Sequence, residues 1–118
     1  PEFSDKHRPW ADEPDDLFTF DPLMGIAARD PNAVFIADVE EEGPDLVNIE
    51  FERRDYGHTA FVHAPIYDGE DLVGILEPCT FGPPRPWTPD EQELVAAVQR
   101  RLGPVVGPFA REAAGAGV

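Results

Sequence analysis

The spacing of apolar and polar residues along the chain predicts short helices that alternate with strands. Near the start, apolar residues at helical spacing follow Asp21, which can cap a helix, and Pro22, which suits the first helical position. They predict a short helix over residues 22–29. Pro31 ends this helix, because the residue before a proline is biased away from the helical region.

Four runs with the composition of β-strands follow this helix. Residues 33–39 and 46–52 are joined by an acidic segment that contains Gly and Pro, and the second run alternates apolar and polar residues. Together they predict an antiparallel hairpin. Residues 58–67 predict a third strand, residues 68–71 a turn, and the almost entirely apolar residues 72–76 a central fourth strand.

The third predicted strand has two different faces, because side chains alternate along a strand. The aliphatic face holds Val62, Ala64 and Ile66. The aromatic face holds Phe61, His63, Pro65 and Tyr67. Proline lacks the N–H that a ladder hydrogen bond needs, so we expect the ladder to be interrupted or bulged at this proline.

A proline-rich loop over residues 77–87 leads to the clearest local signal in the chain. Thr88 and Glu91 form a capping box around Pro89, which predicts the start of a helix. The apolar stripe of that helix consists of Leu94, Val95, Val98 and Leu102. The Gly103-Pro104 pair predicts that the helix ends or kinks near residue 102, with a second helical piece beyond it.

The net charge narrows the range of partners. The chain contains 24 acidic and 9 basic side chains, which gives a formal net charge of -15. Such a chain repels phosphate backbones and anionic membrane surfaces, so nucleic-acid and membrane binding are disfavoured. The acidity has two alternative explanations: the composition of a GC-rich or salt-adapted genome, or an acidic face that binds a basic partner.

Chain length and cysteine content limit the number of domains and disulfides. A chain of 118 residues suits one domain with one core, and a single cysteine, Cys79, excludes an internal disulfide. No run approaches the roughly 20 apolar residues of a membrane helix, and no signal-peptide pattern is present, which indicates a cytoplasmic domain. We expect a flexible tail over residues 1–16, whose first three residues resemble a vector-derived remnant, a folded domain over residues 17–112 and a disordered tail over residues 113–118. The chain is then a piece of a longer protein.

Residues 60–102 resemble the core of the GAF domain family. That family has a strand ending in Val-Pro-Leu, a short turn with Gly and a Leu-Gly-Val-Leu strand, where this chain has Ala64-Pro65-Ile66 and Val73-Gly74-Ile75-Leu76. The closing helix after Trp87-Thr88 also matches. The resemblance implies an α+β fold with an antiparallel β-sheet flanked by helices, in a minimal or truncated member. A PAS-like fold is the alternative for residues 24–38, but the closing helix favours GAF.

The aromatic face of the third strand is the candidate ligand site. If the domain holds a pocket, Phe61, His63 and Tyr67 line it, together with Tyr56 and His58 from the preceding link. An aromatic lining with a few polar atoms suits a small molecule. The alternative is that this face packs against a helix and binds no ligand. Neither the residues nor the resemblance identifies a cofactor.

No group of residues indicates catalysis or metal binding. His58 and His63 are five residues apart in a predicted strand, so they are expected on opposite faces, where they cannot easily chelate one ion. Cys79 has no histidine near it in the sequence, which favours a semi-buried, unreactive thiol. The acidic residues 38–42 fit no EF-hand spacing and indicate a solvated turn. Phosphate-loop, zinc and serine-nucleophile motifs are missing, so we expect no enzymatic activity.

These observations favour a regulatory or sensory module within a larger signalling or transcriptional protein. Its partners are then the other domains of that protein, a small-molecule ligand or a second copy of the chain. The terminal helix supplies the candidate interface residues, which are Leu94, Val98, Leu102 and Phe109. The alternative function is a protein–protein interaction or dimerisation domain that binds no ligand.

Overall fold

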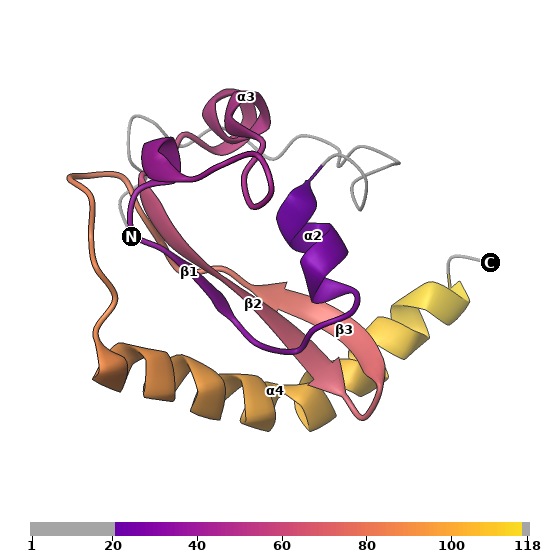
Figure 1. The fold of residues 1–118 in the computed structure, drawn as a ribbon. Helices are drawn as coiled ribbons and strands as arrows, with labels where there is room; N and C mark the ends of the chain where they lie inside the picture. The colour runs from indigo at the N-terminus through magenta and orange to yellow at the C-terminus, as the bar shows by residue number, and fades with distance from the viewer. Residues whose placement is uncertain (1–20, 117–118) are drawn as a thin grey trace.

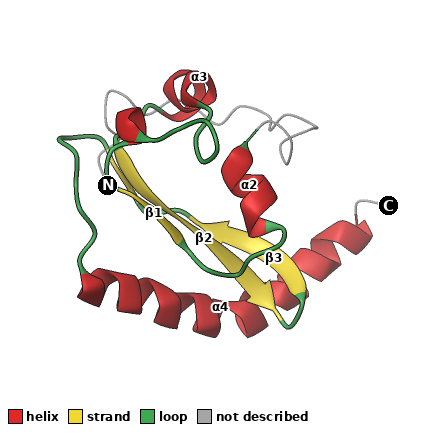
Figure 2. Cartoon of the chain, viewed as in Figure 1, coloured by secondary structure: helices red, strands yellow, loops and turns green. Residues whose placement is uncertain are grey.

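A small antiparallel sheet separates two groups of helices (Figures 1 and 2). The computed structural model describes residues 21–116, so the tail expected over residues 1–16 lies outside the described part. In chain order, the elements are α2 (Pro22–Ala27), β1 (Val34–Ile36), the 3-10 turn η1 (Val39–Glu41), α3 (Ile49–Phe51), the π-helical turn η2 (Glu52–Tyr56), β2 (Ala60–Asp68), β3 (Asp71–Leu76), β4 (Cys79–Thr80) and α4 (Pro89–Ala116). Helix α4 crosses one face of the sheet, whereas α2 and α3 lie beyond the other face. This arrangement confirms the predicted α+β fold class.

Strand β2 is the centre of the sheet. β1 runs antiparallel along one edge of β2, with Ile36 opposite Phe61. β3 runs antiparallel along the other edge, with Ala64 opposite Leu76. β4 pairs with β2 in the same register as the end of β3, so that Cys79 lies opposite Phe61. β3 and β4 are therefore one interrupted strand that follows a single edge of β2.

Both faces of β2 are buried, and each contributes to a separate core. The cluster on the side of α2 and α3 consists of Leu23, Ile36, Val39, Val47 and Phe61. The cluster on the side of α4 consists of Val62, Ala64 and Val95, with Trp87 packed against it. Because alternate residues of β2 enter different cores, the strand is apolar on both faces rather than polar on one.

The predicted starts of α2 and α4 are confirmed. A carboxylate oxygen of Asp21 accepts the backbone N–H of Leu23 at 3.0 Å, which caps α2. At the start of α4, the Thr88 hydroxyl accepts the N–H of Glu91 at 3.2 Å, and the Glu91 carboxylate accepts the N–H of Thr88 at 2.9 Å. These two reciprocal bonds satisfy donors that have no partner within the helix.

The predicted hairpin between residues 33–39 and 46–52 is wrong. The first run contributes only the short strand β1, which pairs with β2 instead. The second run forms α3, because the side-chain oxygen of Asn48 accepts the N–H of Phe51 at 3.2 Å and caps a helical turn. Val47 and Phe51 are four residues apart, so the apolar spacing that suggested a strand fits a helical face as well, and both side chains are buried.

The irregularity expected at Pro65 lies one residue further along β2. The register between β2 and β3 shifts between Ile66 and Tyr67, whereas Pro65 remains paired with Ile75. The carbonyl oxygen of Pro65 accepts a hydrogen bond from the side-chain amide of Gln99 at 2.8 Å. This bond ties the middle of α4 to the central strand just before the shift.

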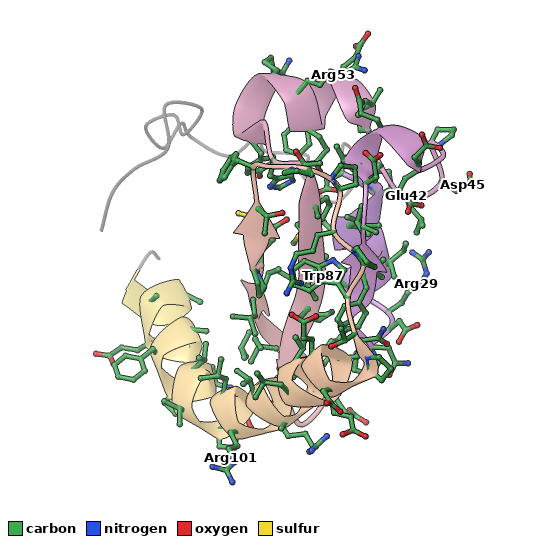
Figure 3. The ribbon with its side chains drawn as sticks, turned by 90° about the vertical axis from the view of Figure 1, so that its left-hand side faces the viewer. Arg29, Glu42, Asp45, Arg53, Trp87 and Arg101 are labelled. Atoms are coloured by element: carbon green, nitrogen blue, oxygen red, sulfur yellow. The ribbon has the colours of Figure 1, made fainter. Side chains whose placement is uncertain are left out.

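Helix α4 continues past the point where the sequence predicted a break. The prediction for Gly103-Pro104 was an end or a kink. The helix contains Pro104 and Pro108 in its interior and does not end near residue 102, and residues 113–116 are helical rather than part of a disordered tail. Both prolines are exposed. The carbonyl groups that lose their helical partners therefore face water, and the helix curves around the sheet (Figures 1 and 3).

Two glycines allow α4 to approach the end of β2 closely. A Cβ atom on Gly103 would lie 2.1 Å from the carbonyl oxygen of Tyr67, and one on Gly107 would lie 2.2 Å from a carboxylate oxygen of Asp68. The side chain of Arg111 also donates a hydrogen bond to Asp68 at 2.8 Å. The missing side chains at 103 and 107 thus set how closely the helix packs on the sheet.

Replacing Gly103 with alanine is expected to lower the free energy of unfolding by about 1–3 kcal/mol. The added methyl group overlaps a backbone carbonyl of β2, and this clash outweighs the better helix propensity of alanine, which is about 1 kcal/mol. Gly115→Ala in the same helix is the matched control, because a Cβ there meets no atom within 4 Å. Urea unfolding of both variants measures the difference. Equal stabilities would contradict the close contact.

Candidate functional site

The aromatic face of β2 is filled by stacked rings. The imidazole of His58 stacks with Tyr56 at a centroid distance of 5.4 Å and with Phe61 at 4.3 Å. Phe51 meets the ring of Tyr56 edge-on at 5.3 Å. Phe61 is completely buried and His58 is 5% exposed. The structure therefore brings three of the five candidate ligand residues into one packed group.

A buried carboxylate and an exposed thiol both act on the imidazole of this group. The Nε2 atom of His58 lies 2.7 Å from a carboxylate oxygen of Glu52, whose residue is only 2% exposed. The Cys79 side chain also contributes to raising the pKa of this imidazole. Cys79 itself is exposed. We call Glu52, His58 and Cys79 the thiol cluster.

The thiol cluster keeps His58 protonated. Burial alone lowers the pKa of His58, but hydrogen bonds to Cys79 and Glu52 and the negative charges of Glu52 and Glu77 outweigh burial and raise this pKa to about 9. His58 is therefore a cation at neutral pH. Its contacts with the rings of Tyr56 and Phe61 are also favourable to a positive charge.

The backbone between η2 and β2 assembles the thiol cluster. η2 ends at Gly57, whose φ of 73° lies in the left-handed region that favours glycine. The N–H of Gly57 donates to the carbonyl oxygen of Glu52 at 2.7 Å, and this turn directs the chain back toward Glu52. The pairing of β2 with β4 then places Cys79 opposite Phe61, on the face of the sheet where His58 packs.

The other two candidate ligand residues do not belong to the stack. His63 is buried in β2 opposite Val34, and burial lowers its pKa to about 4, so its imidazole is neutral at neutral pH. The hydroxyl of Tyr67 donates a hydrogen bond to the carbonyl oxygen of Ala27 at the end of α2. The ligand role of Tyr56, His58, Phe61, His63 and Tyr67 stays a prediction.

Two members of the thiol cluster were not expected from the sequence. Glu52 was assigned to a strand but lies in η2, and Cys79 was expected to be semi-buried but is exposed. The alternation that put His58 and His63 on opposite faces does not apply, because β2 begins only at Ala60. Cys79 is brought to the cluster by the pairing of β2 with β4, and no local sequence pattern predicts this pairing.

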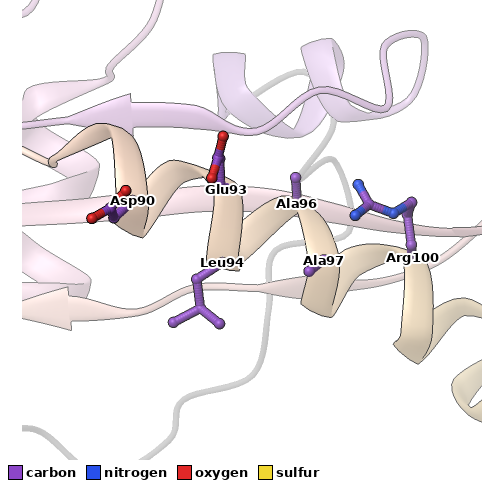
Figure 4. Close-up of a pocket in the computed structure, with 6 residues that line it drawn as sticks. All are labelled: Asp90, Glu93, Leu94, Ala96, Ala97 and Arg100. Carbon is purple, nitrogen blue, oxygen red and sulfur yellow. The ribbon is translucent and has the colours of Figure 1, made fainter.

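An open hollow lies on α4, away from the aromatic face of β2 (Figure 4). Its volume is about 640 Å³. The lining residues are Asp90, Glu93, Leu94, Ala96, Ala97 and Arg100. Its acidic and basic groups lie along one helix and do not converge on a common point, so the hollow offers no built ligand site.

The outward side of α4 carries an apolar stripe. Two of the candidate interface residues, Leu94 and Phe109, are 64% and 70% exposed, and Val105 between them is 59% exposed. Val98 and Leu102 are partly buried at its margin. Arg101 points away from the sheet (Figure 3). We define the α4 stripe as Leu94, Val98, Leu102, Val105 and Phe109.

Comparison with known proteins identifies the family. The GAF domain family matches residues 4–105. The chain belongs to the GAF domain family. Its members are generally sensory or regulatory modules, which agrees with the function class expected from the sequence.

A solved structure is similar to this GAF domain. It is the three-dimensional structure of the photoproduct state of GAF3 from Slr1393 of Synechocystis sp. PCC6803, with a TM-score of 0.60 and 29% sequence identity. The similarity covers 73% of this chain and 54% of that chain, so the present chain spans about half the length of its neighbour. No curated protein matches.

The described part of this GAF domain contains neither a metal-binding cluster nor a membrane-spanning helix. Within residues 21–116, no three His, Cys, Asp or Glu side chains are grouped so that they hold a metal ion. In the same residues, no helix combines the length and apolarity needed to cross a membrane.

The two buried histidines predict a maximum of stability near pH 6.5. The folded-state pKa of His58 is raised to about 9, so its stabilisation is complete below pH 6.5 and is lost between pH 6.5 and 9, by about 3 kcal/mol. The folded-state pKa of His63 is lowered to about 4, so stability falls by about 3 kcal/mol as pH drops from 6.5 to 4. Urea unfolding at a series of pH values measures both changes.

Single substitutions assign each limb of this pH profile to one residue. His58→Gln removes the group that titrates above pH 6.5, so the alkaline limb becomes flatter. His63→Leu removes the buried imidazole and flattens the acid limb above pH 4.5, where ordinary carboxylates are still ionised. A profile that keeps both limbs in both variants would show that other groups cause them.

Proposed function

We propose that this GAF domain is a non-catalytic regulatory module of a cytoplasmic signalling or transcriptional protein, and that its signal passes through α4 to a second copy of the chain. The observation that carries the proposal is the composition of the outward side of α4. Among the described residues, the exposed large hydrophobic side chains are Leu94, Val105 and Phe109, and all three belong to the α4 stripe. A contiguous apolar stripe on an otherwise charged surface is typical of a protein–protein contact.

The α4 stripe is long enough for helix pairing. Leu94 and Phe109 are separated by about 22 Å, at a rise of 1.5 Å per residue. A two-fold axis between Arg101 and Leu102 pairs the two α4 helices antiparallel. Leu94 then lies opposite Phe109 of the second copy, and Val98 lies opposite Val105 of the second copy. Such a self-complementary contact is what two-fold symmetry requires.

Charge selects the antiparallel orientation. In a parallel pair, Arg101 would face Arg101 of the second copy, and like charges at one level of an interface are unfavourable. In the antiparallel pair, Arg101 faces Leu102 of the second copy and extends past it into solvent.

Each copy has a formal net charge of -15, so association depends on apolar contact and strengthens at higher salt, which screens the mutual repulsion.

The packing of the aromatic face supports signalling by helix contacts rather than by a ligand at that face. Tyr56, His58 and Phe61 contact one another, and the ring of Phe61 is completely buried. A small molecule at this position would have to displace these rings. We therefore propose the other domains of the parent protein and a second copy as partners.

Val105→Glu is expected to weaken self-association at least tenfold, because it buries a carboxylate at the centre of the α4 pair (about 1.4 kcal/mol per factor of ten). Sedimentation equilibrium over a range of concentrations measures the dissociation constant. Ala114→Glu is the matched control, since it adds the same charge to α4 at an exposed position outside the stripe. Circular dichroism verifies that both variants are folded.

Two results would overturn this proposal. One is a wild-type domain that remains monomeric at millimolar concentration in high salt. The other is an equal loss of association in Val105→Glu and Ala114→Glu, which would place the contact elsewhere on the molecule.

A further inference from the structure

Strand β3 and its continuation β4 form an outer edge of the sheet. The strand order is β1-β2-β3, and β4 also pairs with β2, so both strands use one side of their backbone for β2. Among the described residues, no strand pairs with the other side of β3. A sheet edge with unpaired backbone groups is a template for a further strand.

The hydrogen-bond pattern shows which backbone groups are left over at this edge. The N–H of Val62 donates to the carbonyl oxygen of Pro78 at 2.9 Å, and these two residues lie opposite each other in the register that β3 and β4 share with β2. In an antiparallel pair, residues that bond to the partner strand alternate with residues that point away from it. Gly74 and Leu76 therefore bond to β2, whereas the N–H and the carbonyl group of Ile75 point outward.

Pro65 supports the same assignment. It lies opposite Ile75 and has no N–H to donate to β3, and its carbonyl oxygen accepts the side-chain amide of Gln99 at 2.8 Å instead. Among the residues that the structure describes, the backbone of Ile75 makes no bond to a loop or a turn either. One donor and one acceptor at the middle of β3 are thus available to another chain.

The outer side of β3 lacks the features that protect exposed strands. Residues 72–76 contain no charged side chain and no proline, and each of them is only partly buried. Pro78 lies beyond them in the phase that faces β2, so its missing N–H does not block the outer side. Natural sheets protect such edges with charges, prolines or a covering segment. We call the outward side of residues 72–76 the open edge.

Charge determines which kind of strand fits the open edge. Glu70 and Asp71 precede it, and Glu77 follows it. Arg111 donates a hydrogen bond to Asp71 at 2.9 Å, but Glu70 is exposed, and the whole chain carries a formal net charge of -15. This field attracts a basic segment and repels a second copy of the same acidic chain.

We propose that the open edge binds an extended, basic segment of a partner protein, which adds a strand to the sheet beside β3. The backbone of the segment exchanges hydrogen bonds with Ile75, and its side chains fall alternately on the two faces of the sheet, beside Ile75 and Leu76. Basic residues at its ends lie near Glu70 and Glu77. The open edge is separate from the α4 stripe, so this inference does not depend on the pairing of two copies.

Hydrogen exchange of single amides, followed by NMR on the whole chain, tests whether the edge is open. In the free protein, we expect the amide of Ile75 to exchange at least about tenfold faster than those of Gly74 and Leu76, because only these two bond to β2. A slow Ile75 amide in dilute protein would show that the edge is covered within the chain. An Ile75 amide that becomes slow only in concentrated protein would show that a second copy covers it. Either result overturns the proposal.

A synthetic peptide of alternating valine and threonine, with two lysines at each end, is the binding probe. At saturation it is expected to slow the exchange of the Ile75 amide at least about tenfold. The same peptide with glutamates in place of the lysines is expected to bind at least about tenfold more weakly. Binding of the lysine peptide weakens as salt is raised, whereas the pairing of α4 strengthens, so the two associations are distinguishable. No binding of the lysine peptide, or equal binding of both peptides, overturns the proposal.

Two charge reversals test whether the attraction is local. Glu70→Lys places a cation beside the open edge and is expected to weaken binding of the lysine peptide about fivefold. Glu93→Lys is the matched control, because it makes the same change of charge at an exposed position near the start of α4. Equal weakening in both variants would show that the net charge, and not the open edge, attracts the peptide.

Ile75→Pro tests the backbone contact itself. It removes the outward N–H without removing a bond to β2, which is the setting in which strands tolerate proline, and it is expected to weaken peptide binding at least about tenfold. Circular dichroism verifies the fold. If this variant does not fold, a lysine peptide methylated on every backbone nitrogen between its ends makes the same test, because it has no N–H to donate to β3. Undiminished binding of the methylated peptide, or of the folded Ile75→Pro variant, overturns the proposal.

Discussion

The burial of β2 on both faces is the constraint on which the rest of the structure depends. Alternate residues enter two different cores: Phe61 packs with the α2 and α3 side, and Val62 packs with Val95 of α4. Both edges of the strand are also paired. Helices α2 and α4 and strands β1, β3 and β4 are therefore each placed by their contact with one side of β2.

The features that could be predicted from the sequence are those with local signals. The capping box at Thr88 and Glu91, the cap at Asp21 and the apolar strands β2 and β3 depend on residues close together in the chain. The resemblance to the GAF family likewise rested on one continuous segment, residues 60–102. The fold class and the face that carries the aromatic residues followed from these signals.

The features that could not be predicted depend on distant partners. The alternation of residues 46–52 fits a strand or a helical turn equally well, and the side-chain cap from Asn48 decides between them. The tolerance of α4 for Pro104 depends on which side of the helix faces water. Likewise, Cys79 lies opposite Phe61 only because β4 resumes the register of β3 after a break.

The buried ion pair of Glu52 and His58 is poorly explained by stability alone. Removing two charged groups from water is costly, and replacing a buried pair with apolar residues of similar size is often neutral or stabilising. Here the pair lies within a cluster of aromatic rings that an apolar residue could fill. The pair instead fixes the charge and the orientation of the His58 imidazole between the rings of Tyr56 and Phe61.

The thiol cluster and the α4 stripe lie on opposite sides of the sheet, and β2 is the physical connection between them. Cys79 is paired with Phe61 at one end of the strand, while Gly103 and Gly107 bring α4 against Tyr67 and Asp68 at the other end. At these two glycines there is no space between α4 and the strand, so the strand cannot move toward the helix without displacing it. Close-packed interiors transmit displacements rather than damping them. A displacement of β2 must therefore either strain the strand or move α4, and a movement of α4 shifts the α4 stripe on its outward side.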